Sequence, residues 1–365
     1  MMLYKFLSAS SVENIVISLN GTRSAPMAEK IESLDVNIYY LGMRSNRIKL
    51  ENILDLWRII KIESPDVVQG WMYHGNMMAL LATRLKPNIP VLWNIRHSLH
   101  DLSEEKRVMR LLIRLNAFFS KTPVNILYNS SVTARQHERY GLKESKTKII
   151  PNGFDSNKFS PNADIRRDIR KKYNVKENQC LFAMVARYHP VKGHSVLLNA
   201  LSILIKRNRN LKVMLVGKGL ESTNHSLVEL INQCGLSDFV LLLGEREDIP
   251  QLMSSFDVLV SASWGEAFPN CVGEAMLSGV PCIVADVGDS KWIVGDWGKV
   301  VKPGDVEGLS NACSEYMVMD TGVRQTIGRH ARDRIKSHFG LDKIAQQYDF
   351  LYQTVENGTH SKSCG

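Results

Sequence analysis

The sequence predicts an α/β protein built from two doubly wound parallel sheets. Short apolar runs alternate with stretches of helical length, which is the pattern of strands joined by crossover helices. Most of the runs are apolar on both faces, as expected for strands that are buried in a parallel sheet. The series occurs twice along 365 residues, a length that suits two domains of ordinary size.

The first series predicts a Rossmann-like domain at 1–160. Its strands are expected at 14–19, 36–41, 66–71, 90–95, 124–129 and 147–152. Segments 50–63 and 75–85 are the clearest of the intervening helices, and their length suits crossovers between parallel strands.

The second series predicts another Rossmann-like domain at 161–338. Its strands are expected at 180–186, 211–217, 239–244, 257–262 and 281–286. Its helices are expected near 193–207, 225–234, 270–278 and 305–318. The polar stretch 160–179 is the expected join between the domains, and the last residues, 357–365, are expected to be disordered.

Positive charge is concentrated in the first part of the chain. Residues 1–150 hold 21 basic and 13 acidic residues, whereas the remainder holds 25 and 24, so the first part carries nearly all of the net charge of +9. Such a bias favours an anionic partner. The sequence contains neither an RNA-binding aromatic motif nor a basic DNA-recognition helix, so acidic lipid or a pyrophosphate is favoured over nucleic acid.

The sequence predicts a cytoplasmic protein. No uncharged apolar run approaches the ~20 residues that span a bilayer, and the first residues lack the layout of a secretory signal. None of the six cysteines belongs to a C-x-x-C pair or to a Cys/His cluster with zinc-ligand spacing. We interpret them as reduced thiols that mostly occupy core positions.

Two glutamates, Glu266 and Glu274, flank the predicted start of a helix after the strand at 257–262. Ligands of doubly wound sheets bind beyond the carboxyl ends of the strands, and Pro269 suits a first helical turn. The free N–H groups near Asn270 would favour an anion, and a carboxylate can accept hydrogen bonds from two hydroxyl groups. This order therefore suits a sugar, a diphosphate and a ribose. Helix-capping acids on a solvated surface are the alternative.

Two cations follow the strand at 180–186. Arg187 and Lys192 flank a tight loop and could both reach a pyrophosphate. Gly193 would let the backbone approach a ligand, and Lys218, after the next strand, is a weaker candidate for the same anion. A solvated basic loop is the alternative.

Taken together, these motifs resemble those of the retaining glycosyltransferases of family 4. The family pattern R-x4-K-G is present at 187–193, E-x-F-P-x5-E at 266–274 and A-x-x-x-G-x-P at 275–281. Residues 150–155 resemble the family's domain junction, and 339–356 resembles the helix that crosses back to the first domain. The resemblance covers most of the chain. It implies the GT-B fold, in which two Rossmann-like domains face each other across a cleft.

The resemblance also implies a donor site in the second domain. Arg187 and Lys192 would neutralise the diphosphate of a UDP-sugar or GDP-sugar, with no cofactor or metal, since the chain has no Asp-x-Asp. Glu274 would hold the ribose hydroxyls, and Glu266 would hold those of the transferred sugar. The remaining donor-binding candidates are Phe268, Pro269, Asn270 and Arg246. Arg246 lies in the segment 244–248, which would hold the base and which a simple turn after a strand explains equally well.

In the first domain, His97 resembles the family's active-site histidine beside the donor sugar. With Glu266 it forms the predicted catalytic pair. His100 is the rival, because periodicity does not choose between the two histidines. The candidates for the acceptor side are three residues near predicted strand ends: His74, Asn94 and Arg96.

Segment 103–121 predicts a helix in which basic residues accompany leucines and phenylalanines. A basic amphipathic helix can lie on acidic lipid. Many members of the family act on polyprenyl-diphosphate sugars at the inner face of the membrane. Peripheral membrane contact is therefore one interpretation, and a core helix with a solvated basic face is the other.

The start of the chain departs from the family pattern. The family begins with a central strand and a glycine-rich loop, whereas the first residues here resemble the helix that follows them. Without that strand, two inner strands would lack a partner on one side, which is costly. We therefore expect that the sequence starts late, with residues 2–7 as the other candidate for the strand.

The predicted function is transfer of a sugar from a nucleotide-diphosphate sugar to a glycan or a polyprenyl-diphosphate-linked acceptor, in cell-surface polysaccharide biosynthesis. A GT-B-fold nucleotide-sugar epimerase and a truncated, non-catalytic nucleotide-sugar-binding protein are the alternatives. A dehydrogenase is disfavoured, because no G-x-G-x-x-G follows a strand.

Overall fold

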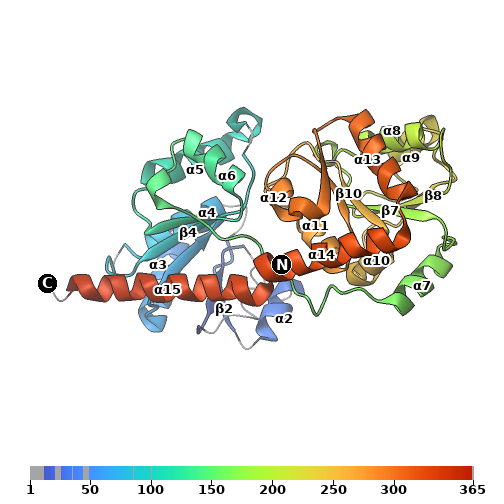
Figure 1. Cartoon of the computed structure of the whole chain (residues 1–365). Helices are drawn as coiled ribbons and strands as arrows, with labels where there is room; N and C mark the ends of the chain where they lie inside the picture. Colours follow the sequence, from blue (N-terminus) through green and yellow to red (C-terminus); the bar gives the residue numbers. More distant parts are fainter. Residues whose placement is uncertain are drawn as a thin grey trace. The chain divides into compact units, whose positions relative to one another are not determined.

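The chain divides into two compact units. The computed structural model describes residues 12–20, 26–34, 36–43, 49–84, 86–99 and 101–363. Unit 1 comprises Met1–Gly153 and Leu341–Gly365, and unit 2 comprises Phe154–Gly340 (Figure 1). The boundaries lie close to the predicted ones at 160 and 338.

The strands of unit 1 are all parallel to their partners. They are β1 (Ile15–Ser18), β2 (Asn37–Tyr40), β3 (Val68–Trp71), β4 (Val91–Ile95), β5 (Asn125–Tyr128) and β6 (Thr147–Ile149). The described strands form two sheets, β1-β2 and β3-β4-β5-β6. Residues 2–7, the other candidate for a first strand, lie outside the described part of the chain.

Helices cover both faces of the four-stranded sheet. The helices of unit 1 are α2 (Pro26–Glu32), α3 (Leu50–Glu63), α4 (Met72–Ala82), α5 (Arg107–Phe119), α6 (Ser131–Arg139) and α15 (Leu341–Ser363). Successive side chains of a strand point to opposite faces. Trp93 of β4 accordingly packs with Tyr73 of α4 and Ile113 of α5, whereas Leu92 packs with Ile344 and Tyr348 of α15.

The last helix is longer than the sequence predicts. α15 continues to Ser363, so it includes most of the segment 357–365 for which we expected disorder (Figure 1). The physical reason is that extending an existing helix by one residue costs far less than starting a new one, and no proline interrupts this segment.

Unit 2 is a doubly wound domain with one six-stranded parallel sheet. Its strands are β7 (Cys180–Val185), β8 (Leu211–Val216), β9 (Val240–Leu242), β10 (Val258–Ser261), β11 (Cys282–Ala285) and β12 (Gly298–Val301). Their order is β12-β11-β10-β7-β8-β9, so the winding direction changes between β7 and β10. Ligands of such sheets bind beside this switch point, at the carboxyl ends of the strands.

Two helical layers enclose this sheet (Figure 1). The helices of unit 2 are α7 (Ala163–Lys172), α8 (His194–Leu204), α9 (His225–Gln233), α10 (Ile249–Ser255), α11 (Asn270–Leu277), α12 (Ser290–Val294), α13 (Val306–Val318) and α14 (Thr321–Phe339). Phe182 of β7 belongs to the core beneath α8 and α13, and the adjacent Leu181 belongs to the core beneath α10, α11 and α14.

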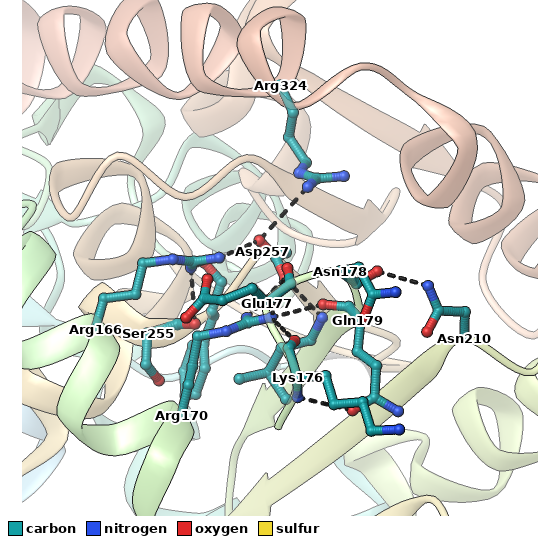
Figure 2. Close-up of polar contacts among 12 residues, drawn as sticks. Arg166, Arg170, Lys176, Glu177, Asn178, Gln179, Asn210, Ser255, Asp257 and Arg324 are labelled. Atoms are coloured by element: carbon teal, nitrogen blue, oxygen red, sulfur yellow. Dashed lines mark hydrogen bonds and ion pairs between the residues drawn. The ribbon is translucent and has the colours of Figure 1, made fainter. Parts of the chain in front are cut away.

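A buried charge cluster lies where β7 and β10 begin (Figure 2). The Asp257 carboxylate accepts from Arg166 of α7 at 2.7 Å, from Arg170 of α7 at 3.0 Å and from the Leu181 backbone at 2.7 Å. Arg324 of α14 lies 3.6 Å from the same carboxylate. Burial alone would raise the pKa of Asp257, but the arginines and the backbone donor hold this pKa below its ordinary value. The cluster ties two helices to the amino end of the sheet.

Candidate active site

The loops that follow the strands of unit 2 meet at the switch point. Tyr188 N donates to Lys218 O at 2.8 Å, which joins the loops after β7 and β8. Trp264 N donates to Val191 O at 2.8 Å, which joins the loops after β10 and β7. These bonds bring the sequence-predicted segments 187–193 and 264–269 side by side at the carboxyl edge of the sheet.

Gly193 fixes how closely these two loops approach. It has φ +73°, and a Cβ atom there would lie 2.0 Å from the carbonyl oxygen of Ala262, at the end of β10. We had expected the space beside Gly193 to be open to a ligand. It is taken instead by the backbone at Ala262. The glycine acts instead by bringing Lys192 next to the loop after β10.

Lys192 and Glu266 form an ion pair as a result. The Lys192 ammonium donates to Glu266 Oε1 at 2.6 Å, and the Ser263 hydroxyl donates to the same oxygen at 2.8 Å. Both partners are largely shielded from solvent. Because both bonds fall on Oε1, neither uses Oε2 of the carboxylate. The alternative of two acids on a solvated surface is thus wrong for Glu266.

The second glutamate of the motif is buried within α11. Pro269 is the N-cap residue of this helix, one position before the place that we expected for it, and Asn270 is the first helical residue. Glu274 is 6% exposed. The thiol of Cys271 has its pKa raised to about 12, first by burial, and the charges of Glu266, Lys192 and Glu274 all act on it. Three charged groups therefore gather around the first turn of α11.

The remaining cations are open to solvent. Arg187 lies two residues beyond the end of β7 and is exposed, and Lys218 after β8 is exposed as well. Within the described residues, no hydrogen bond or ion pair joins either side chain to Lys192 or Glu266. The structure thus brings Lys192 and Glu266 together and leaves Arg187 and Lys218 as unpaired positive charge on neighbouring loops.

Two predicted donor-binding side chains have other partners. Phe268 is buried, and its ring lies 6.0 Å from that of Phe154 and 5.7 Å from that of Phe339. Arg246 donates to both carboxylate oxygens of Asp248, at 2.8 and 2.6 Å. These contacts occupy both side chains in the structure, and donor binding by Phe268 or Arg246 stays a prediction. Phe268 supports the loop from below, and Arg246 closes its own turn.

In unit 1, His97 lies just beyond β4 and is partly exposed. Its Nδ1 lies 3.2 Å from Tyr73 Oη, and its Nε2 lies 3.4 Å from Glu105 Oε1. Tyr73 Oη is also 2.6 Å from His137 Nε2. The sequence reasoning missed these partners, because residues 73, 97 and 137 approach one another only in the folded domain. His100, the rival histidine, lies outside the described residues.

Asn94 and Arg96, which were predicted to face an acceptor, form hydrogen bonds within unit 1. Asn94 is buried, and its amide donates to Tyr348 Oη at 3.1 Å. Arg96 donates to the same hydroxyl at 2.6 Å, to Asn94 Oδ1 at 3.1 Å and to Asn152 Oδ1. These bonds attach α15 to β4, and the acceptor-side role of the two residues stays a prediction.

His74, the third acceptor-side candidate, is partly exposed. It lies in the first turn of α4, and partial burial lowers the pKa of its imidazole.

Within the described residues, no group of three or more His, Cys, Asp and Glu side chains could hold a metal ion. None of the helices in the described ranges is long and apolar enough to cross a bilayer.

Two family models match the chain. The model described as Glycosyltransferase Family 4 matches residues 1–158, and the model described as Glycosyl transferases group 1 matches residues 179–318. These ranges correspond to the first and second Rossmann-like domains.

Curated relatives extend over nearly the whole chain. The UDP-Gal:alpha-D-GlcNAc-diphosphoundecaprenol alpha-1,3-galactosyltransferase of Escherichia coli is 26% identical over 93% of this chain and 89% of its own length. The capsular polysaccharide biosynthesis glycosyltransferase CapM of Staphylococcus aureus is 22% identical over 86% of this chain and 83% of its own length.

Solved structures share the fold. Anabaena Alr3699/HepE, in complex with UDP and glucose, matches with a TM-score of 0.82 at 21% identity over 97% of this chain and 95% of that one. WaaG, a glycosyltransferase involved in lipopolysaccharide biosynthesis, matches with a TM-score of 0.69 at 17% identity, over 96% and 95%. These structures have the GT-B fold. With family models matching both domains, the chain is a family 4-like glycosyltransferase of the GT-B fold.

Proposed function

We propose that the protein transfers a sugar from a nucleotide-diphosphate sugar, with retention of configuration and without a metal, to a glycan or a polyprenyl-diphosphate-linked acceptor. The observation that carries the proposal is the Lys192–Glu266 pair, which joins the loop after β7 to the loop that leads into α11, the helix in which Glu274 is buried. UDP and glucose bound to Anabaena HepE support a nucleotide-sugar donor. The diphosphoundecaprenol substrate in the name of the Escherichia coli relative supports a lipid-linked acceptor.

Lys192 would exchange partners when the donor binds. A flexible ammonium group can turn from a carboxylate to a diphosphate, which offers it more negative charge. Arg187 and the first N–H groups of α11 would complete the stabilisation of the leaving diphosphate. Glu266, released from Lys192, would accept hydrogen bonds from the hydroxyl groups of the transferred sugar. Glu274 would hold the ribose.

Unit 1 would supply the acceptor side of the reaction. His97 would bind the transferred sugar as the second member of the catalytic pair, and His74 would face the acceptor. Hydrolysis competes with transfer, so exclusion of water is part of what the enzyme must achieve.

We also propose that α5 lies on an acidic membrane at the cytoplasmic side. One face of α5 packs Ile113 into the core of unit 1, yet Val108, Leu111 and Phe118 of the same helix are 72%, 60% and 76% exposed. Exposed Arg107 and Arg114 accompany them. Apolar side chains can enter the lipid while arginines pair with anionic headgroups.

Sedimentation with vesicles tests the membrane contact. We expect the protein to bind vesicles that contain phosphatidylglycerol, to bind less at high salt, and to lose binding when Leu111 and Phe118 are both replaced by Ser. Val318→Ser, at an exposed apolar position of unit 2, is the matched control. Equal binding by the double variant would contradict the proposal.

Thermal-shift measurements with UDP, GDP and ADP test the donor site. We expect at least one nucleotide to raise the melting temperature of the full chain and Arg187→Ala to weaken that shift. No shift in a folded sample would overturn the proposal. Incubation with the matching nucleotide sugar but no acceptor then separates transfer from epimerisation, since only an epimerase yields an isomerised sugar.

A further inference from the structure

His97 is the outer member of a chain of hydrogen bonds inside unit 1. The chain runs from His97 Nδ1 to Tyr73 Oη at 3.2 Å, from Tyr73 Oη to His137 Nε2 at 2.6 Å, and from His137 Nδ1 to the carbonyl oxygen of Thr133 at 2.8 Å. Tyr73 and His137 are almost fully buried. Neither side chain has a role in the function proposed above.

The inner end of this chain determines where each proton lies. A carbonyl oxygen only accepts, so His137 Nδ1 must carry the proton that it donates to Thr133. Burial lowers the pKa of His137 to about 4, so this ring is neutral near pH 7 and its Nε2 is an acceptor. Tyr73 therefore donates its hydroxyl proton to His137, and its oxygen is left to accept from His97.

We propose that Tyr73 is a positioning residue that holds His97 in the tautomer with its proton on Nδ1. The Nε2 atom of His97 is then the outward acceptor. Under the proposed function, on which this step rests, that nitrogen accepts a hydrogen bond from a hydroxyl group of the transferred sugar. Glu105 lies on the same side, with its Oε1 atom 3.4 Å from this nitrogen.

The junction between β3 and α4 places Tyr73 under His97. β3 ends at Trp71 and α4 begins at Met72, with no residue between them. Met72 has φ +61°, a conformation that is strained for a side chain of this size and that is found most often at functional sites. The Asn116 amide also donates to the Tyr73 carbonyl at 3.2 Å. The backbone of Tyr73 is therefore held independently of its hydroxyl group.

The loop that carries His97 has its own attachment to α6. Gln136 Oε1 accepts from the backbone of Leu99 at 2.9 Å. Leu102 N donates to Tyr140 Oη at 3.1 Å. Loss of the Tyr73 hydroxyl should consequently leave the loop in place and release only the ring of His97. A purely structural role for Tyr73 predicts the opposite, a loosened loop with an unchanged tautomer.

The tautomer can be read directly by NMR without any ligand. The full chain is labelled with 15N-histidine and studied at pH 8, above the ordinary pKa of imidazole at ~6.5. His97→Gln assigns the His97 signals among the ten histidines. We expect a protonated Nδ1 and a bare Nε2 for His97, and a change to the Nε2–H form in Tyr73→Phe. A proton on Nε2 in the natural protein, or no change in Tyr73→Phe, overturns the proposal.

Replacements of His137 provide a second test if Tyr73→Phe does not fold. The amide oxygen of His137→Gln can accept the Tyr73 proton in place of Nε2, whereas His137→Leu cannot. We expect His137→Gln to keep the His97 tautomer and His137→Leu to lose it. If both variants give the same His97 tautomer, the proposed direction of the hydrogen bonds from His97 through Tyr73 to His137 is wrong.

Enzyme kinetics separate this inference from the proposed function. We expect Tyr73→Phe to lower kcat about tenfold, with little change in the KM for the donor, because a buried hydrogen bond of this kind is worth about one power of ten. An unchanged kcat in Tyr73→Phe, where His97→Gln has lost activity, counts against Tyr73 as a positioning residue. Absence of transfer in the natural protein counts against the proposed function alone, because the tautomer is measured without substrate.

Discussion

The two ends of the six-stranded sheet in unit 2 hold polar groups in opposite ways. At the amino end, Asp257 is buried and accepts from Arg166, Arg170 and the backbone (Figure 2). At the carboxyl end, Lys192 and Glu266 form one ion pair between loops that also carry exposed cations. The first arrangement leaves little for a ligand to gain, whereas the second can exchange partners. Under the proposed function, the stabilising cluster and the donor site thus lie at opposite edges of one sheet.

The largest expected effect is on stability and comes from Asp257→Asn. The variant keeps the shape of the side chain but leaves buried guanidinium groups without a counter-charge, which typically costs about 3–5 kcal/mol. We expect calorimetry of the full chain to show an earlier unfolding transition. If the variant unfolds like the natural protein, the amino-end cluster is not a source of stability and the contrast between the two ends is wrong.

Lys192→Ala should have a comparable effect on the reaction and little effect on stability. Loss of one charge that stabilises a leaving group lowers kcat by about 10²–10³-fold. The measurement is transfer from the donor that the thermal-shift screen identifies. Lys206→Ala is the charge-matched control, because Lys206 is exposed just beyond the other end of α8. A melting temperature that falls as far as in Asp257→Asn would show that the carboxyl end is structural too.

Acid should weaken the amino-end cluster. The native pKa of Asp257 lies below the ordinary value of ~3.9 in the unfolded chain, so its contribution is fully present above that value and is lost as the pH falls through the native pKa. Each unit by which the native pKa is lowered corresponds to about 1.4 kcal/mol of stability. We expect the difference in melting temperature between the natural protein and Asp257→Asn to shrink between pH 6 and pH 3. A constant difference would show that the pKa is not depressed.

The smallest expected effect is that of Arg246→Ala. Among the described residues, Arg246 bonds only to Asp248 in its own turn, and exposed pairs of this kind contribute about 0–1 kcal/mol. We expect donor affinity from thermal-shift titration to stay within a factor of two to three of the natural value. A tenfold weaker affinity would restore the donor-binding role first expected for this residue.

Periodicity and motif spacing predicted much of the fold and part of the site. The alternation of apolar runs and helical stretches predicted two parallel α/β domains, and the spacing of Glu266 and Glu274 around Pro269 predicted where a helix begins. The strand β12 was missed, because its run of four residues starts with glycine and is too short to show a pattern. Such local sequence signals predict a structural feature correctly where that feature depends only on residues of the same strand, loop or helix.

Side-chain partners were harder to predict. Arg246 was assigned to a ligand although Asp248, two residues on, takes its charge. Arg96 was assigned to an acceptor although it donates to Tyr348, more than 250 positions away, as its neighbour Asn94 also does. The first partner could have been predicted by weighing local ion pairs. The second could not, because a sequence without a fold does not show which distant groups meet.

The direct junction of β3 and α4 limits how the first domain can change over evolutionary time. An α-helix turns by about 100° per residue, so one residue added or removed at Trp71–Met72 would swing Tyr73 out of the interior and rotate His74 toward it. Connections on protein surfaces usually tolerate such drift in length. Here the insertion or deletion of one residue would displace both Tyr73, which contacts His97 and His137, and His74. Variation at this point should therefore be confined to substitutions.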